Sequence, residues 1–423
     1  MVKDLIKFID ASPTAFGATA NIKTILEEHG YEPLKEKKIV KGKKYYVTRN
    51  DSSIAAFAVG KKLNDPAIHI AASHTDCPSF KLKPNPIIKT PNGIRLNVEV
   101  YGGILRRPWF DRPLSLAGRV IVKRKDKIAC RNFIDDKPFC IIPSMAPHLN
   151  HNIEEKIPDV AVDMVPIVSL DDKYDFNDYL AKKLKVSKND ILGFDLYLYP
   201  LDKGYVWGKD DEFITQGHLD NLECAYTSLM GFVDNFNDDN INLYLSFDNE
   251  EVGSLTRQGA DSDFMEGIIR RICKDLSLDY DRLIEHGILL SCDNAHALHP
   301  NYPELYDPNN SPKLNGGVVV KYNAAQSYCT DSLSGAIFKK LLSDNKIPFQ
   351  NYANKTGIRG GGTLGNLSTA HISIMSIDIG LAQWAMHSPV ETAGTKDVEY
   401  MIEALKAFYK SHLSIDEKGN YSI

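Results

Sequence analysis

The sequence predicts an α/β protein in which helices cover a mostly parallel sheet and a β-rich segment is inserted. After about residue 205, strand-like apolar runs alternate with helix-length periodic segments, which is typical of a parallel sheet. Residues 86–204 instead contain short strand-like runs between turns rich in Pro and Gly. Outside this segment, several strand-like runs end beside His, Asp or Glu. Together these observations predict the fold class and place candidate site residues at strand ends.

Bulk composition excludes several classes of protein. The 423 residues suffice for two domains, or for one large domain carrying an insertion. A net charge of −5 argues against nucleic acid or an anionic membrane as partner. No apolar run reaches the roughly 20 residues of a membrane span. The N-terminal segment lacks the apolar core of a signal peptide, and the seven scattered cysteines contain no CxxC. We therefore expect a cytoplasmic protein with reduced thiols.

The first part of the chain mixes helix and strand patterns. Apolar periodicity predicts helices within residues 1–35, and residues 45–48 and 54–59 predict a hairpin. Residues 66–72 predict a short buried strand.

The β-rich segment has no convincing helical periodicity before about 175–185, and turn-forming joints at 84–86 and 201–204 bound it. The sequence thus predicts one discontinuous domain, residues 1–85 and 205–423, and an inserted domain, residues 86–204.

In the last part of the chain, helix-like and strand-like patterns alternate. Helices are expected near residues 217–232, 264–276, 331–342 and 397–410, and strands at 241–247, 287–291, 318–322 and 371–377. In the strand at 241–247, apolar residues alternate with polar ones, which predicts a strand with one buried face.

Metal-capable side chains follow four of the predicted strands. They are His74 and Asp76, Glu250 and Glu251, Asp293, and, after a longer loop, His387; Asp220 joins them at a helix start. Because the carboxyl ends of parallel strands share one edge of a sheet, these side chains are expected to converge. Imidazole and carboxylate ligands suit Zn²⁺, Mn²⁺ or Co²⁺, and an odd carboxylate can bridge two ions. A glutamate that binds no ion can serve as general base. For Glu250 and Glu251 taken alone, an acidic turn before a helix is the alternative.

Other motifs are weaker or absent. The sequence contains no HExxH and no GxSxG. Residues 360–365 match GxGxxG, but a strand-like run begins soon after them, which argues against a dinucleotide site. A loop that faces an anion, or a close-packed turn, is the better interpretation. His296 and His299 are expected to be structural, whereas His148 and His151 remain ambiguous.

Six blocks of sequence carry a resemblance to a known family. They are SHTDCPSFKLKPNP, YGG followed by WFDRPLSLAGRV, GHLDN, DNEEVGS, CDNAHALHPNYPELY and AMHSPVE. In this order they resemble the aspartyl aminopeptidase family, which are dinuclear zinc aminopeptidases, and the similarity spans nearly the whole chain. The segment at 105–108, which is more basic and bulky than expected after YGG, and the Gly-rich segment at 360–362 depart from the family pattern. Both departures leave the preferred substrate side chain open.

The resemblance implies a role for each candidate residue. His74 and Asp293 hold one metal ion, Glu251 and His387 hold the other, and Asp220 bridges them. Glu250 acts as general base, and Asp76 orients His74. Lys321 and Tyr328 hold the carboxylate of the substrate side chain, although the strand containing Lys321, taken alone, favours a surface position. The resemblance also implies a zinc aminopeptidase-like fold with residues 86–204 as a dimerisation domain. It further implies a tetrahedral dodecamer built from dimers, in which His148 reaches a neighbour's active site.

The expected function is metal-dependent removal of N-terminal residues from peptides, with Asp and Glu preferred. An aminopeptidase of broad or non-acidic preference on the same scaffold is the second hypothesis. A non-catalytic scaffold with a metal site is the third, and Glu250 argues against it because a structural site needs no spare base.

Overall fold

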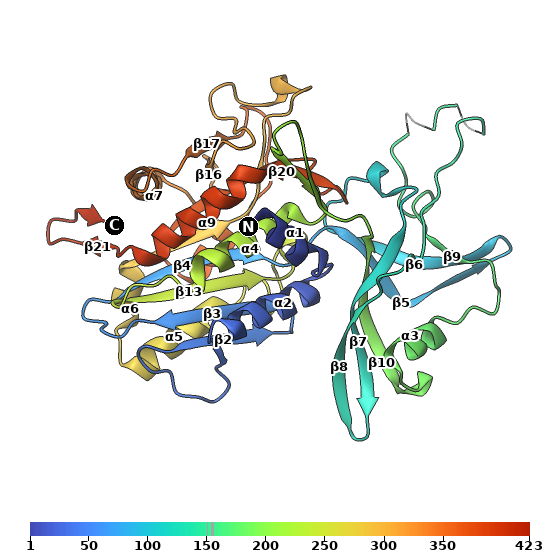
Figure 1. Ribbon diagram of the computed structural model, residues 1–423, viewed down its shortest axis with the longest axis horizontal. Helices are drawn as coiled ribbons and strands as arrows, with labels where there is room; N and C mark the ends of the chain where they lie inside the picture. Colours follow the sequence, from blue (N-terminus) through green and yellow to red (C-terminus); the bar gives the residue numbers. More distant parts are fainter. Residues whose placement is uncertain (150, 154–155) are drawn as a thin grey trace.

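The computed structural model describes residues 1–149, 151–153 and 156–423. Figure 1 shows two bodies. The larger is a sheet flanked by helices, and both chain termini lie in it; the smaller is β-rich and lies beside it. Within the described residues, no helix has the length and hydrophobicity that crossing a membrane requires.

The large sheet contains nine strands in the described part of the chain. Their order is β1 (Glu32–Pro33), β2 (Lys44–Arg49), β3 (Ser53–Val59), β13 (Asn240–Phe247), β4 (Ala67–His74), β14 (Gly287–Cys292), β18 (Met375–Gly380), β16 (Val318–Tyr322) and β17 (Phe349–Ala353). The four strands β13, β4, β14 and β18 are neighbours and run parallel, whereas β3 and β16 flank them antiparallel. The predicted sheet is confirmed, and the carboxyl ends of four central strands meet at one edge.

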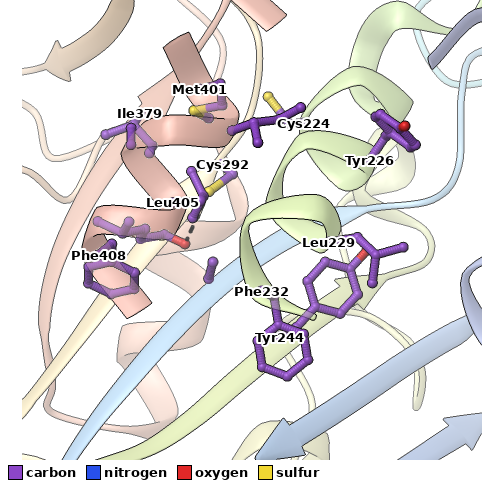
Figure 2. Packing of buried hydrophobic residues seen from close by; sticks show 14 of the residues in the cluster. Cys224, Tyr226, Leu229, Phe232, Tyr244, Cys292, Ile379, Met401, Leu405 and Phe408 are labelled. Atoms are coloured by element: carbon purple, nitrogen blue, oxygen red, sulfur yellow. Dashed lines mark hydrogen bonds between the residues drawn. The ribbon is translucent and has the colours of Figure 1, made fainter. Parts of the chain in front are cut away.

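Helices cover both faces of the large sheet. On one face lie α1 (Val2–Asp10), α2 (Ala15–Glu28), α4 (Leu219–Phe232), α7 (Ser332–Asp344) and α9 (Thr395–Lys410); on the other lie α5 (Phe264–Leu276), α6 (Tyr280–Glu285) and α8 (Leu364–His371). Figure 2 shows Leu229 and Phe232 of α4, and Met401, Leu405 and Phe408 of α9, in the cluster above the strands. This packing holds α4, whose first turn contains Asp220, against the sheet.

The central strand β13 is buried on both faces, so the prediction of a single buried face is wrong. Its polar residues lie under the helices and bond to backbone carbonyls there. The Nδ2 of Asn242 donates to the carbonyls of Asn235 and Tyr409, and the Tyr244 hydroxyl donates to the carbonyl of Ala225. These donors thus find backbone acceptors, which offsets the cost of burying them, whereas Asn242 Oδ1 has no partner among the described residues.

The smaller body is built on a second sheet, which has six strands among the described residues. Their order is β8 (Lys127–Ile134), β7 (Leu114–Arg124), β10 (Ile191–Pro200), β5 (Ser79–Thr90), β6 (Gly93–Tyr101) and β9 (Ile167–Ser169), and α3 (Phe176–Leu184) packs against them. Strand β5 pairs with β6 from Ser79 onward, so the predicted joint at 84–86 lies inside a strand. The register shifts between Leu82 and Ile87, and such an irregularity accommodates the two prolines.

A third, smaller sheet includes the strands that precede and follow His387 in the chain. Its order is β11 (Tyr205–Trp207), β12 (Phe213–Gln216), β20 (Glu391–Gly394), β19 (Ala382–Trp384) and β15 (Ala295–His296), and near the end of the chain β21 (Ser414–Ile415) pairs with β22 (Tyr421–Ser422). The strand predicted at 371–377 begins only at Met375, because α8 extends to His371. Ile372 and Ile374 are buried in the intervening turn, so apolar and polar residues alternate there as they would in a strand.

Candidate metal centre

The structure brings the five predicted metal ligands and Glu250 to the carboxyl edge of the large sheet. His74 ends β4, and Asp293 directly follows β14. Glu250 and Glu251 lie in a 3₁₀ turn after β13, His387 follows β19, and Asp220 lies in the first turn of α4. Convergence at this edge was the central prediction from the sequence, and the distances confirm it.

Asp220 lies between the two histidines and faces each with a different oxygen. Its Oδ1 is 3.6 Å from His74 Nε2, and its Oδ2 is 3.5 Å from His387 Nε2. His74 Nε2 also lies 3.7 Å from Asp293 Oδ1, and His387 Nε2 lies 3.5 Å from Glu251 Oε2. A carboxylate that faces two ligand groups in this way has the geometry of a bridging ligand.

The donor atoms form three groups among the described residues. In each group, one ligand atom per residue lies within 4.8 Å of the others: His74, Asp220 and Asp293; Asp220, Glu251 and His387; His74, Glu250 and Glu251. The first two groups share Asp220, and the third places Glu250 beside the same centre.

The residues present fit bound zinc. Asp220 Oδ1 and Glu251 Oε1 are buried and accept no hydrogen bond from the described residues. A buried carboxylate oxygen without a donor is unfavourable, and a cation would compensate it. Imidazole nitrogen and carboxylate oxygen are ligands that zinc accepts. Side-chain exposure of 32% at His387 and 17% at Glu250 keeps the centre accessible to a substrate.

The crowded carboxylates shift the pKa values of the cluster. Burial raises the pKa of Glu250 to about 8; His74 opposes this increase, and Asp293 adds to it. Burial lowers the pKa of His387, but its hydrogen bond with Asp220 and the charge of Glu251 outweigh that effect and raise it to about 10. The metal-free cluster therefore holds protons that a divalent cation would displace.

Asp76 contacts both His74 and the acidic turn. His74 Nδ1 lies 3.0 Å from the backbone oxygen of Asp76 and 3.4 Å from its Oδ1. The carboxylate also accepts the backbone N–H groups of Glu250 and Glu251, each at 3.2 Å, and the Tyr101 hydroxyl at 2.6 Å. The predicted contact with His74 is present, and Asp76 additionally holds the turn that carries Glu250.

The segment that follows β6 completes the surroundings of His387, and the sequence did not predict this contact. The carbonyl oxygen of Gly103 lies 2.8 Å from His387 Nδ1, and the N–H of Leu105 donates to the His387 carbonyl at 3.0 Å. A carbonyl on the free nitrogen of a ligating histidine sets the ring orientation and tautomer. The only sequence signal was the YGG block at 101–103.

A buried glutamate was also missed. Glu391 begins β20, and its carboxylate accepts the backbone N–H of Asp220 at 3.0 Å and that of His387 at 2.7 Å. Its place in the AMHSPVE block was the one indication in the sequence.

Of the predicted substrate-binding residues, Lys321 and Tyr328 lie together beside Asp293, whereas His148 lies on an exposed loop. Lys321 is only 1% exposed, which excludes the surface position that its strand alone favours. Its ammonium donates to the backbone carbonyls of Asp293 at 2.8 Å and Asn294 at 3.3 Å and lies 5.1 Å from the Tyr328 ring centroid. His148 is exposed on the loop between β8 and β9 and is not among the ligand groups of the described residues.

Comparison with known proteins identifies the family. The family described as Aminopeptidase I zinc metalloprotease (M18) matches residues 8–409. The chain belongs to the M18 family of zinc metallopeptidases. It is 42% identical, over 96% of its length and 98% of the relative's, to "Probable M18 family aminopeptidase 2" of Clostridium novyi. This M18 chain is therefore a metallo-aminopeptidase, a hydrolase of peptide bonds.

Solved structures agree with this assignment. The structure of the Ape4 and Nbr1 complex matches with a TM-score of 0.91 and 31% identity, covering 96% of this chain and 85% of that one. A structure described as an mApe1 dodecamer matches with a TM-score of 0.85 and 26% identity, covering 96% of each chain. The α/β fold with additional antiparallel sheets is therefore that of M18 aminopeptidases.

Proposed function

We propose that this M18 aminopeptidase uses two divalent ions per chain, preferentially zinc, to remove N-terminal Asp and Glu from peptides. The observation that carries the dinuclear centre is the position of Asp220, whose two oxygens face two separate ligand groups. In this proposal His74 and Asp293 would hold one ion, Glu251 and His387 would hold the other, and Asp220 would serve both. Bound zinc supplies Lewis acidity toward the attacking water and the scissile carbonyl.

Glu250 is assigned as the general base. Its carboxylate lies 3.9 Å from His74 Nε2, and Asp76 holds its backbone N–H. A carboxylate beside the attacking water can accept its proton, and Glu250 is the acid of this centre that is not assigned as a ligand. Glu250 takes a proton from the attacking water and delivers it to the leaving amine.

Lys321 and Tyr328 are assigned to the side-chain pocket. An ammonium has three donors, and two of those on Lys321 face the carbonyls of Asp293 and Asn294. The ammonium also lies 3.8 Å from Asp293 Oδ2, and in this proposal its third N–H binds the substrate carboxylate when Asp293 is engaged by the metal. A desolvated anion among several carboxylates needs such a cation, which supports a preference for acidic residues. An enzyme of broad preference remains the second candidate.

Assembly into a homododecamer built from dimers is part of the proposal. The mApe1 relative is described as a dodecamer. The body of the second sheet exposes large apolar side chains: Leu149 by 80%, Ile157 by 76%, Val162 by 68% and Leu170 by 82%. Apolar surface of this kind favours contact with another subunit. We assign the inserted body, predicted at residues 86–204, to dimerisation, and His148 to contact with a neighbour's active site.

The decisive experiment combines metal analysis with a substrate panel. We expect about two zinc ions per purified chain and loss of activity on chelation. Hydrolysis of aminoacyl-nitroanilides should be fastest for Glu and Asp, slower for Leu and Lys. Full activity with fewer than two ions would contradict the dinuclear centre, and equal rates on all four substrates would favour the broad-preference enzyme. Light scattering that reports an active monomer would contradict the assembly.

A further inference from the structure

Glu391 holds two residues of the proposed centre through their backbones. Its side chain is buried, with 1% of its surface exposed. Oε2 accepts the N–H of Asp220, and Oε1 accepts the N–H of His387. One carboxylate therefore holds two segments that lie far apart in the sequence. Its hydrogen bond to Asp220 spans 171 positions.

The two halves of the centre differ in the backbone that carries them. His74 lies within β4, and Asp293 directly follows β14, so regular ladder hydrogen bonds hold that half. Asp220 instead has non-helical dihedral angles (φ −81°, ψ 106°) inside the first turn of α4. His387 has φ 70°, a left-handed conformation that a non-glycine residue keeps only where its surroundings enforce it. Glu391 bonds to both irregular segments.

Glu391 is suited to this task because it is an acceptor on both sides. An ionised carboxylate has two oxygens that only accept, and both face N–H groups here. A glutamine in the same place would direct an amide NH₂ at one of the two N–H groups.

We propose that Glu391 is a positioning residue that sets the affinity of one ion, the ion assigned to Glu251 and His387. This inference rests on the proposed dinuclear centre. Losing the Glu391 carboxylate loosens His387 and the backbone of Asp220, which both ions share, whereas His74 and Asp293 keep the support of the strands. The ion assigned to His74 and Asp293 is therefore retained when the other is lost.

The test compares Glu391→Gln with a matched control, Asp397→Asn. Asp397 is also fully buried and also accepts two backbone N–H groups, but these belong to Asn315 and Gly317. Zinc content is measured by equilibrium dialysis across a series of buffered free-zinc concentrations, with thermal unfolding recorded for each variant. We expect Glu391→Gln to weaken one of the two ions by roughly 10- to 100-fold, and Asp397→Asn to retain both at wild-type affinity.

Each outcome has a defined meaning. One weakened ion in Glu391→Gln, with two in the wild type and the control, supports the inference. Two unchanged ions, or equal weakening of both, overturn it. Fewer than two ions in the wild type refute the dinuclear proposal itself, and this inference falls with it. If Glu391→Gln does not fold, Glu391→Asp carries the same expectation, because a side chain one methylene shorter cannot reach both N–H groups.

Discussion

The large sheet and the second sheet build the same site from different kinds of atoms. The large sheet and its helices contribute ionisable side chains, such as His74, Asp220 and Asp293. The second sheet and the segment after β6 contribute a carbonyl oxygen from Gly103 and a hydroxyl from Tyr101, which orient groups supplied by the other body. The large sheet thus supplies most of the ionisable side chains, and the second body adds orienting contacts to those that Asp76 and Glu391 make.

The basic residues after Gly103 belong to this second contribution. Arg106 donates to the carbonyl of Pro158 at 2.8 Å, and Arg107 donates to the carbonyl of Ile153 at 3.3 Å. The departure from the family pattern at 105–108 therefore joins the loop of the second body to the segment that contacts His387. The predictions below test this division of labour, from the largest expected effect to the smallest.

Glu250→Gln tests the large sheet's catalytic group. We expect turnover to fall by roughly 10²–10⁴, the range that general-base catalysis supplies. Zinc content should stay at the wild-type value, because Glu250 is not assigned as a ligand. Steady-state kinetics and metal analysis measure the two quantities, with the exposed Glu417→Gln as control. Near-normal turnover in Glu250→Gln would refute the assignment.

The pH dependence of zinc binding tests the same cluster without its substrate. In the metal-free protein the pKa of His387 is raised to about 10, so this ring holds a proton at neutral pH that zinc must displace. Affinity should therefore rise with pH, by about tenfold per unit for each displaced proton, between roughly pH 6 and 8. Competition titrations at several pH values measure this slope. A slope of zero would show that no ligand binds a proton in this range.

Lys321→Leu tests the side-chain pocket. A lost charge-assisted hydrogen bond of about 1.5–3 kcal/mol should lower kcat/KM for Glu and Asp substrates by roughly 10- to 150-fold. For Leu and Lys substrates kcat/KM should fall less, because these substrates depend on Lys321 only through its support of the Asp293 loop. The same panel applied to Tyr328→Phe isolates the contribution of the hydroxyl. Equal losses on all four substrates would remove Lys321 from specificity.

Tyr101→Phe tests the second body's contribution to the site. Tyr101 donates to Asp76 at 2.6 Å and accepts from Asn249 at 2.8 Å. Losing one hydrogen bond to a carboxylate should cost about 1.5 kcal/mol, or roughly tenfold in kcat/KM. The exposed Tyr205→Phe serves as control. An unchanged rate in Tyr101→Phe would show that Asp76 holds the acidic turn unaided.

Asp135→Asn should affect only the stability of the smaller body. The Asp135 carboxylate accepts the Tyr179 hydroxyl and pairs with Lys183 at 2.7 Å. Burial tends to raise the pKa of Asp135, but the bonds from Lys183 and Tyr179 outweigh it and lower the pKa. A lowered folded-state pKa adds stability above the unfolded value of about 3.9, which is lost as pH falls through the folded value. Thermal unfolding of wild type and variant should therefore differ at neutral pH and converge in acid, with kcat/KM at neutral pH unchanged.

The sequence by itself determined where the metal-capable side chains lie along the chain. His74 and Asp293 lie within a residue of strand ends, and apolar periodicity reveals those strands locally. The rule that parallel strands share one carboxyl edge then predicts convergence without any coordinates. Individual roles came from the family resemblance, because spacing alone does not distinguish a ligand from a base.

Only the tertiary structure decided how those side chains are held. Gly103 contributes a backbone carbonyl, which any residue possesses, to a histidine 284 positions away. Glu391 contributes a carboxylate whose partners are backbone N–H groups, so no pattern of side chains marks it. The second buried face of β13 and the early start of β5 likewise depend on which segments pack or pair across the fold. The type of each side chain can be read directly from the sequence, whereas contacts through the backbone form only once folding has brought distant segments together.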